Sequence, residues 1–360
     1  MSTMSTMSTI TFLLIFSTLA TARFNVTSNF RVDVHTHFIP DFYREALINS
    51  GNAEIRNGTE VWSEGAIIPK WSIEAQIETM DTNGIDYSVL SLSAPGVAFL
   101  HGNPAAANLT RRLNDYLFEL MELYPGRIGA FCVLPLPNVE AALEEIEYCM
   151  DTLGFAGVGL FTNHDGVYLG DSNLDPIFDL LSTRNLTTFV HPTVPNCWKD
   201  VTLGYAPPLI EFPFDTMRAI MNLFLTGTRA RYQHINMIFS HGGGVLPFLA
   251  ERVAYTVERP AFGGYRSEDV LDQFKGYFFD TASTVSRPQL AALDEFGVAG
   301  RLMTGTDYPF LPGNFTNGYP AAIAAYGKFT EEVIEGINSQ NALSVLPVVV
   351  EKLGLEILYN

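Results

Sequence analysis

The alternation of short apolar runs with longer amphipathic runs is the feature that most constrains the fold of this chain. Eight apolar runs have the length and composition of β-strands: residues 30–34, 87–93, 128–134, 155–161, 186–190, 235–239, 276–282 and 301–305. Helical patterns lie between them, as at 108–124, where Leu and Phe recur at spacings of three and four. Apolar strands that alternate with helices indicate parallel strands buried on both faces. Eight such units predict an α/β fold of the (β/α)8 barrel type.

A doubly wound open sheet is the alternative fold. It is disfavoured because no Gly-x-Gly-x-x-Gly follows the first strand. The chain has 360 residues, of which 47% are hydrophobic and 17% charged, and this composition supports a sizeable core. No long linker or repeat interrupts it after the amino terminus. We therefore predict a single barrel domain over residues 23–360.

The amino terminus has the pattern of a targeting segment. The apolar run Ile10 to Ala20 is too short to span a bilayer, and Ala20-Thr21-Ala22 has the small-x-small form of a cleavage site. We predict a signal peptide over residues 1–22, no membrane span once it is removed, and a secreted or vesicular protein. The leader carries no positive charge, and a non-functional leader would leave the protein cytoplasmic. Five Asn-x-Ser/Thr glycosylation sequons favour the secretory route: Asn25, Asn57, Asn108, Asn185 and Asn314.

The net charge restricts the classes of molecule that the protein can bind. A formal net charge of −18 argues against binding to nucleic acid or to anionic membranes. An anionic substrate would therefore need a local metal ion or an arginine.

The three cysteines, Cys132, Cys149 and Cys197, form no Cys-x-x-Cys pair. Cys132 lies in an apolar run typical of a buried thiol, and whether any two cysteines form a disulfide stays open.

Polar residues gather at the carboxyl ends of the expected strands, which is where barrels of this kind build their active sites. In VDVHTHFIP, His35 and His37 are two residues apart and share one face of an extended strand. His191, His241 and Asp307 each follow another apolar run. We predict a metal site formed by three of these histidines, His35, His37 and His191, and by Asp307, with His241 as a nearby titrating group. Imidazole-rich ligation with an open position suits Zn²⁺, with Mn²⁺ or iron as alternatives.

Four motifs carry a resemblance to a known family. VHTH, FVHP, SHGGGVLPFLAERV and GTDYPF, in this order, resemble the amidohydrolase superfamily and, within it, the aminocarboxymuconate-semialdehyde decarboxylase group. PKWSIEAQIETMDTNGIDYSVLSLSAPG and EFPFDTMRAI look most similar to fungal 6-methylsalicylate decarboxylases. The resemblance implies a metal-dependent lyase that removes CO2 from a small aromatic o-hydroxy carboxylate, such as 6-methylsalicylate to m-cresol, as in polyketide secondary metabolism.

The same resemblance implies two substrate contacts. Arg252 matches an arginine that reaches a carboxylate in the neighbouring subunit's site, which implies a homodimer; a surface salt bridge is the alternative. Phe310 matches a pocket aromatic, with a plain core role as the alternative. One position departs from the family, because Thr193 stands where the semialdehyde decarboxylase has a tryptophan. This difference speaks against the muconate semialdehyde as substrate.

The decarboxylation needs a proton at the ring carbon that bears the carboxylate. We predict that Asp307 donates it, with a raised pKa and with help from His241. The competing class is hydrolysis of an amide, ester or lactone, or hydration, by the same ligands. A two-metal hydrolase is disfavoured, because the run at 155–161 continues into Thr162-Asn163-His164 and offers no lysine to bridge the metals.

Overall fold

The computed structural model describes residues 23–100, 103–311 and 318–358. Its centre is a sheet of eight parallel strands in the order β14-β13-β12-β11-β8-β7-β6-β2. The strands are β2 Val32–Phe38, β6 Tyr87–Leu92, β7 Ile128–Cys132, β8 Gly157–Phe161, β11 Thr188–His191, β12 Met237–Phe239, β13 Phe278–Asp280 and β14 Leu302–Met303. The two edges meet, because Val34 N–H donates to the Thr304 carbonyl (3.0 Å) and Thr36 bridges Tyr308 in parallel. The predicted barrel and all eight predicted strands are confirmed.

The first strand differs from the prediction in one respect that matters for the site. β2 continues to Phe38, so His35 and His37 lie inside its carboxyl-terminal half and not after its end. Its pairing with β6 shifts register between Asp33 and Thr36. The sequence pattern missed this extension because the apolar run stops at Val34, whereas the strand continues through buried polar residues.

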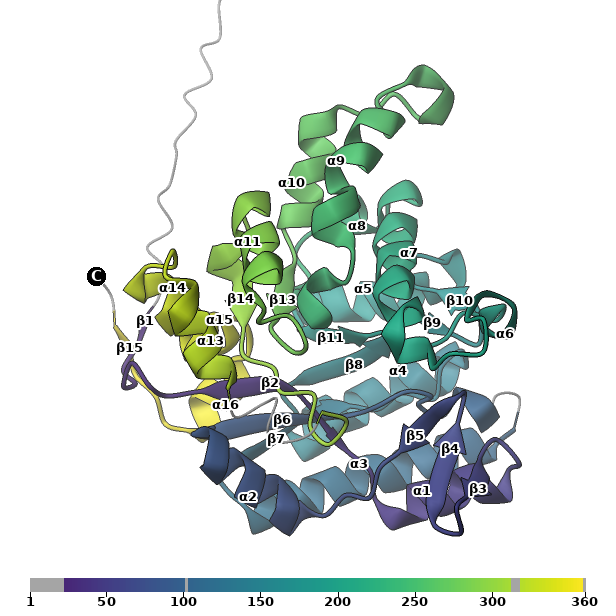
Figure 1. Cartoon of the computed structure of the whole chain (residues 1–360). Helices are drawn as coiled ribbons and strands as arrows, with labels where there is room; N and C mark the ends of the chain where they lie inside the picture. Colours follow the sequence, from purple (N-terminus) through teal and green to yellow (C-terminus); the bar gives the residue numbers. More distant parts are fainter. Residues whose placement is uncertain (1–22, 101–102, 312–317, 359–360) are drawn as a thin grey trace, which may run out of the picture.

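Helices surround the strands (Figure 1). The longer ones are α1 Asp41–Asn49, α2 Ile73–Asn83, α3 Ala105–Leu123, α4 Val139–Tyr148, α5 Asp175–Thr183, α7 Glu211–Leu225, α9 Leu246–Val257, α10 Ser267–Lys275, α11 Arg287–Phe296 and α13 Tyr319–Tyr326. Shorter helices are α6 Trp198–Val201, α8 Thr228–Arg231, α14 Glu331–Glu335, α15 Asn341–Val345 and α16 Pro347–Lys352. Among these described helices, none combines the length and the apolar character needed to cross a bilayer.

Local sequence signals explain where two of these helices begin and end. Ser72 caps α2, because its hydroxyl oxygen accepts a hydrogen bond from Ala75 N–H at 3.2 Å. α4 runs into a π-turn at Cys149–Leu153, which ends at Gly154 with φ of +63°. A left-handed residue ends a helix without strain only when it lacks a Cβ, and glycine meets this need.

A small antiparallel sheet lies outside the barrel and was not predicted. It consists of β3 Glu54–Arg56, β4 Glu60–Ser63 and β5 Ala66–Ile68, inserted between α1 and α2 (Figure 1). Two more antiparallel pairs join β1 Arg23–Phe24 to β15 Ile357–Leu358, and β9 Asn163–His164 to β10 Val167–Tyr168. These strands are too short to give a periodic apolar signal.

The barrel interior is packed with apolar side chains from alternate strands, including Val34, Phe131, Phe189, Ile238 and Met303. A second and larger apolar cluster fills the space between the strands and the helices. This rigid frame fixes the positions of the side chains at the carboxyl ends of the strands.

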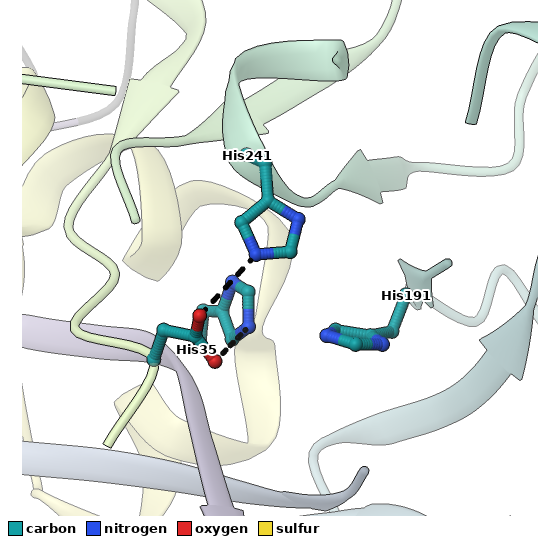
Figure 2. A group of neighbouring side chains, drawn as sticks. His35, His191 and His241 are labelled. Carbon is teal, nitrogen blue, oxygen red and sulfur yellow. Dashed lines mark hydrogen bonds and ion pairs between the residues drawn. The ribbon is translucent and has the colours of Figure 1, made fainter. Parts of the chain in front are cut away.

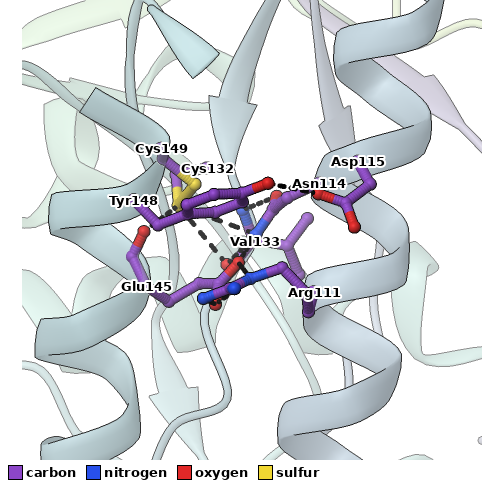
Figure 3. The surroundings of a disulfide bond; sticks show 8 residues. All are labelled: Arg111, Asn114, Asp115, Cys132, Val133, Glu145, Tyr148 and Cys149. Atoms are coloured by element: carbon purple, nitrogen blue, oxygen red, sulfur yellow. Dashed lines mark hydrogen bonds and ion pairs between the residues drawn. A yellow bond between two sulfur atoms is a disulfide. The ribbon is translucent and has the colours of Figure 1, made fainter. Parts of the chain in front are cut away.

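A disulfide joins Cys132, the last residue of β7, to Cys149, which follows α4 (Figure 3). The expectation of a buried free thiol at Cys132 is therefore wrong. The two cysteines lie 17 residues apart and become neighbours because α4 packs back along β7. Cys197 is free and exposed.

The sequon asparagines Asn25, Asn57, Asn108 and Asn185 are all exposed. Asn314 and the predicted signal peptide lie outside the described residues.

Candidate metal centre

Five side chains from four strand ends converge at the carboxyl-terminal mouth of the barrel. His35 and His37 come from β2, His191 ends β11, His241 follows β12, and Asp307 follows β14. In Figure 2 the imidazoles of His35, His191 and His241 point toward a common region, and dashed lines join two of them to carboxylate oxygens. The structure thus brings together every residue predicted for the metal site, and His241 lies with them.

The spacing of these side chains fits a single metal ion. His35 Nε2 lies 3.1 Å from His37 Nε2 and 3.4 Å from Asp307 Oδ1. His37 Nε2 lies 3.3 Å from the same Asp307 oxygen. Ligands held about 2.1 Å from a shared tetrahedral ion lie roughly 3.4 Å apart, so these separations match the edges of a coordination shell.

His241 belongs to the site as closely as His37 does. One ligand atom from each of His35, His191, His241 and Asp307 lies within 4.8 Å of the other three. His241 Nε2 is 3.4 Å from Asp307 Oδ2, the carboxylate oxygen that does not face His35 and His37. From the sequence we expected His241 to position water or to assist proton movement, whereas the geometry also offers it as a fourth nitrogen donor.

Neighbouring groups orient three of the imidazoles. His35 Nδ1 contacts the Asp280 carboxylate at 2.8 Å, and His191 Nδ1 donates to the Pro192 carbonyl at 2.7 Å. His37 Nδ1 lies 3.1 Å from the Ser91 hydroxyl. Because each Nδ1 is engaged in this way, each Nε2 faces the centre, where it offers a lone pair whenever its ring is neutral. A carboxylate behind a metal-binding histidine also makes that histidine a stronger ligand.

Burial sets the charge state of two imidazoles. Burial lowers the pKa of His37, and burial together with the neighbouring histidines places the pKa of His191 well below its usual range. Both rings are therefore neutral near pH 7, which is the state that binds a cation. For His35, burial also lowers the pKa, but the carboxylates of Asp280 and Asp307 outweigh it and raise the pKa to about 10.

The predicted raised pKa of Asp307 is wrong for the protein alone. Burial does raise the pKa of this carboxyl, but the charge on His35 and hydrogen bonds from His241, His35 and His37 outweigh burial. The pKa of Asp307 consequently lies well below its usual range. Asp307 is therefore a carboxylate near neutral pH, which suits a metal ligand.

The backbone holds two of these residues in an uncommon conformation. His241 has φ of +55° and Asp307 has φ of +58°. A non-glycine residue in the left-handed region costs about 1–3 kcal/mol and persists only where its surroundings impose it. His241 N–H donates to Asp280 Oδ1 at 3.0 Å, and Asp307 N–H donates to the His35 carbonyl at 2.8 Å. These bonds lock both side chains toward the centre.

A cavity of about 540 Å³ opens onto the metal centre, within the size range of small-molecule sites. Its wall includes His191, His241 and Asp307, and otherwise is mostly apolar. Phe310 lines it, with its ring 5.5 Å from that of His37. This position is the one expected of a pocket aromatic, although Phe310 also packs against the main core.

Arg252 lies apart from the centre of its own chain. It is exposed on α9 and does not line the cavity, and within the described residues it forms no ion pair. The surface salt bridge considered from the sequence is therefore not seen among the described residues. A role in substrate binding would require a second copy of the chain.

Sequence reasoning missed Asp280 and Glu64. Asp280 is fully buried at the end of β13 and supports His35. A charged residue within the apolar run GYFFDTA was the available signal. Glu64 lines the cavity from the small sheet, whose strands the pattern did not predict.

Comparisons with known proteins agree with this geometry. An amidohydrolase family model matches residues 32–348. Decarboxylase yanB of Aspergillus niger is 32% identical over 332 residues, which cover 88% of this chain and 87% of that protein. The 6-methylsalicylic acid decarboxylase acuB of Aspergillus aculeatus is 31% identical over 334 residues, covering 88% and 96%.

A solved structure shares the fold. The 5-carboxyvanillate decarboxylase of Novosphingobium aromaticivorans superimposes with a TM-score of 0.75 at 20% identity, covering 88% of this chain and 96% of that one. Its crystals contain manganese and 4-hydroxy-3-methoxy-5-nitrobenzoic acid.

Proposed function

Because the chain belongs to the amidohydrolase family, we propose that it is a metal-dependent decarboxylase of o-hydroxybenzoates such as 6-methylsalicylate. The observation that best supports this function is that four imidazoles and one carboxylate converge at the base of a mostly apolar cavity large enough for a substituted benzoate. Relatives that cover most of the chain and are named as decarboxylases of this substrate support it.

Zn²⁺ is the proposed ion, because imidazole-rich ligation favours it; Mn²⁺, present in the similar 5-carboxyvanillate decarboxylase, is the alternative. A bound divalent cation would lower the pKa of the phenol and neutralise the charge of the carboxylate. His35, His37, His191 and Asp307 would hold the ion, and His241 would complete the ring of donors or move a proton.

The low pKa of Asp307 sets how the proton travels. A carboxylate of low pKa holds no proton in the resting protein, so we assign the phenol of the substrate as the source of the proton. The phenol proton passes to Asp307 and then to the ring carbon that bears the carboxylate. The bond from that carbon to the carboxylate breaks, CO2 leaves, and the ring regains aromaticity. His241, 3.4 Å from Asp307, returns a proton from solvent to the phenolate.

The direct test is incubation of the metal-loaded protein with 6-methylsalicylate, with m-cresol and CO2 measured together and metal content determined on the same sample. Equimolar m-cresol and CO2 support the function. Hydrolysis of a lactone or an ester, without CO2 release from any o-hydroxybenzoate, would replace it with the hydrolase alternative.

We also propose that the protein is a homodimer in which Arg252 completes the partner's site. Phe248 and Tyr255 are 68% and 60% exposed and share one face of α9 with Arg252. More exposed apolar residues lie just before α7 and on it: Leu203, Leu209, Ile210 and Phe214. Exposed apolar side chains in such numbers are typical of an interaction surface.

Mixing two inactive variants tests both parts of this assembly. Arg252→Ala and Asp307→Asn chains, re-associated one to one, form heterodimers in half of the dimers. Each heterodimer has one intact site if Arg252 acts across the interface, so about a quarter of wild-type activity returns. No recovery, or a monomer by sedimentation, contradicts this assembly.

The predicted secretory route remains a proposal as well. The Cys132–Cys149 disulfide supports it, because such bonds persist mainly in oxidising compartments. Expression of the full chain in a fungal host, followed by mass spectrometry of the medium, would reveal cleavage near Ala22 and glycans on exposed sequons. An uncleaved intracellular protein would contradict it.

A further inference from the structure

The small antiparallel sheet forms one wall of the substrate cavity. Trp62 from β4 and Ile67 and Ile68 from β5 line the cavity, as does Glu64 in the turn between these strands. The sheet is inserted after α1, so its strands are separate from the barrel strands that carry the metal ligands. The insert can therefore set which ring substituents the cavity accepts without altering the metal centre.

Glu64 is the charged side chain of this cavity outside the metal centre. The other titratable residues among the described ones that line the cavity are His191, His241 and Asp307. No arginine or lysine of the described part of the chain lines it. A monocyclic o-hydroxybenzoate chelated at the centre fills only part of about 540 Å³, which leaves room for a further substituent toward the insert.

The carboxyl of Glu64 has no hydrogen-bond or ion-pair partner among the described residues. Burial raises its pKa to about 7, so near neutral pH both the acid and the carboxylate are populated. A partly buried carboxyl without a partner loses solvation that a ligand group can restore. A hydroxyl on the substrate ring would supply this partner, as donor to the carboxylate or as acceptor from the acid.

The backbone conformation of the turn does not favour a glutamate at position 64. Glu64 and Gly65 form a two-residue hairpin turn with φ of +48° and +77°. The first position of such a turn favours Asn, Asp or Gly, and a glutamate in the left-handed region is strained by about 1–3 kcal/mol. Strained residues persist where their surroundings impose them, and they cluster at functional sites.

The turn is also held in place from outside. A Cβ at Gly65 would lie 3.2 Å from both Pro207 Cδ and Trp198 Cζ3, so the backbone packs closely against the α6 region. The carboxyl of Glu64 is thus presented from a fixed backbone position rather than from a loose loop.

We propose that Glu64 determines substrate specificity by hydrogen-bonding a second hydroxyl group on the ring of the o-hydroxybenzoate. It also disfavours substrates with a second carboxylate at that place, because two like charges would meet in an apolar cavity. This inference rests on the proposed decarboxylase function and narrows its substrate class from methyl-substituted to ring-hydroxylated o-hydroxybenzoates.

Three acids test this inference: 6-methylsalicylate, 2,4-dihydroxy-6-methylbenzoate and an o-hydroxybenzoate with a second ring carboxylate. The wild type should prefer the dihydroxy acid over 6-methylsalicylate in kcat/KM by about tenfold, the effect of one hydrogen bond to a buried carboxyl. Glu64→Leu should abolish this preference, because kcat/KM should fall about tenfold more for the dihydroxy acid than for 6-methylsalicylate. Glu64→Gln should keep part of the preference and accept the dicarboxylate better.

Glu54→Leu is the matched control, because Glu54 lies in the same sheet but is exposed and pairs with Arg56 outside the cavity. It should keep the wild-type preference. An equal loss for all acids in Glu64→Leu, or an unchanged preference, overturns the role of Glu64 while the decarboxylase function stands. If the wild type releases CO2 from none of these acids, the proposed function fails. Calorimetric affinities of the same acids for metal-loaded wild type and Glu64→Leu then decide the role of Glu64 alone.

Discussion

Asp280→Asn tests how the protein prepares His35 to bind metal. Asp280 Oδ1 accepts hydrogen bonds from the backbone N–H groups of His241 and Ala282, at 3.0 and 2.9 Å. In the variant the amide oxygen stays there, because these buried donors need an acceptor. The amide NH2 then faces His35 Nδ1, which must accept instead of donate, and the ring proton moves to Nε2. That nitrogen faces the centre and loses its lone pair.

The expected loss follows from this change of tautomer. The replaced bond is a fully buried contact of 2.8 Å between a carboxylate and an imidazole. Loss of such a supporting carboxylate typically weakens metal binding about 10- to 100-fold, or about 1.4–2.7 kcal/mol. Competition against a chromophoric chelator measures this affinity, and circular dichroism establishes that the variant is folded.

Asp33→Asn provides the matched control. Asp33 is equally buried, but it accepts hydrogen bonds from His35 N–H and from Thr306, and it forms no hydrogen bond with an imidazole of the described residues. Its variant should change metal affinity by less than about tenfold. A folded Asp280→Asn protein with wild-type affinity, or equal losses in the two variants, would show that Asp280 does not set the tautomer of His35.

Three further outcomes follow from the same structure. Asp307→Asn should lower CO2 release by about 10²- to 10⁴-fold even in samples shown by metal analysis to be loaded; full activity with metal bound would exclude it as the proton carrier. Cys149→Ser should lower the unfolding free energy in urea by about 3 kcal/mol, because it opens a 17-residue loop; an unchanged midpoint would refute this. The pKa of Glu64 is raised on folding from 4.5 to about 7, so its ionised form destabilises the fold as pH rises through this window. Glu64→Gln should therefore gain about 1–3 kcal/mol over wild type between pH 4.5 and 8, and a pH-independent difference would contradict this.

The strand pattern could be predicted because burial on both faces leaves continuous apolar runs, and all eight were found. The residues at the mouth followed from the rule that sites form at the carboxyl ends of barrel strands. Histidine is rare in this chain, so its placement after apolar runs was informative.

The features of the site that could not be predicted from the sequence depend on contacts between distant segments of the chain. The partner of His35 is Asp280, 245 residues away, and no local pattern joins them. The pKa of Asp307 was misjudged because proximity to histidines, rather than burial alone, decides it. The insert that carries Glu64 is too short and too polar for its strands to show a period, and it therefore escaped prediction.

We propose that one metal ion, held by these side chains, is required for the decarboxylation. Titration of metal-free protein with Zn²⁺ or Mn²⁺, with CO2 release from an o-hydroxybenzoate followed at each step, tests it most directly. Activity should rise in proportion to bound metal and level off at one ion per chain, and His35→Ala should show no such rise. Full CO2 release without metal, or a plateau only at two ions per chain, would contradict it.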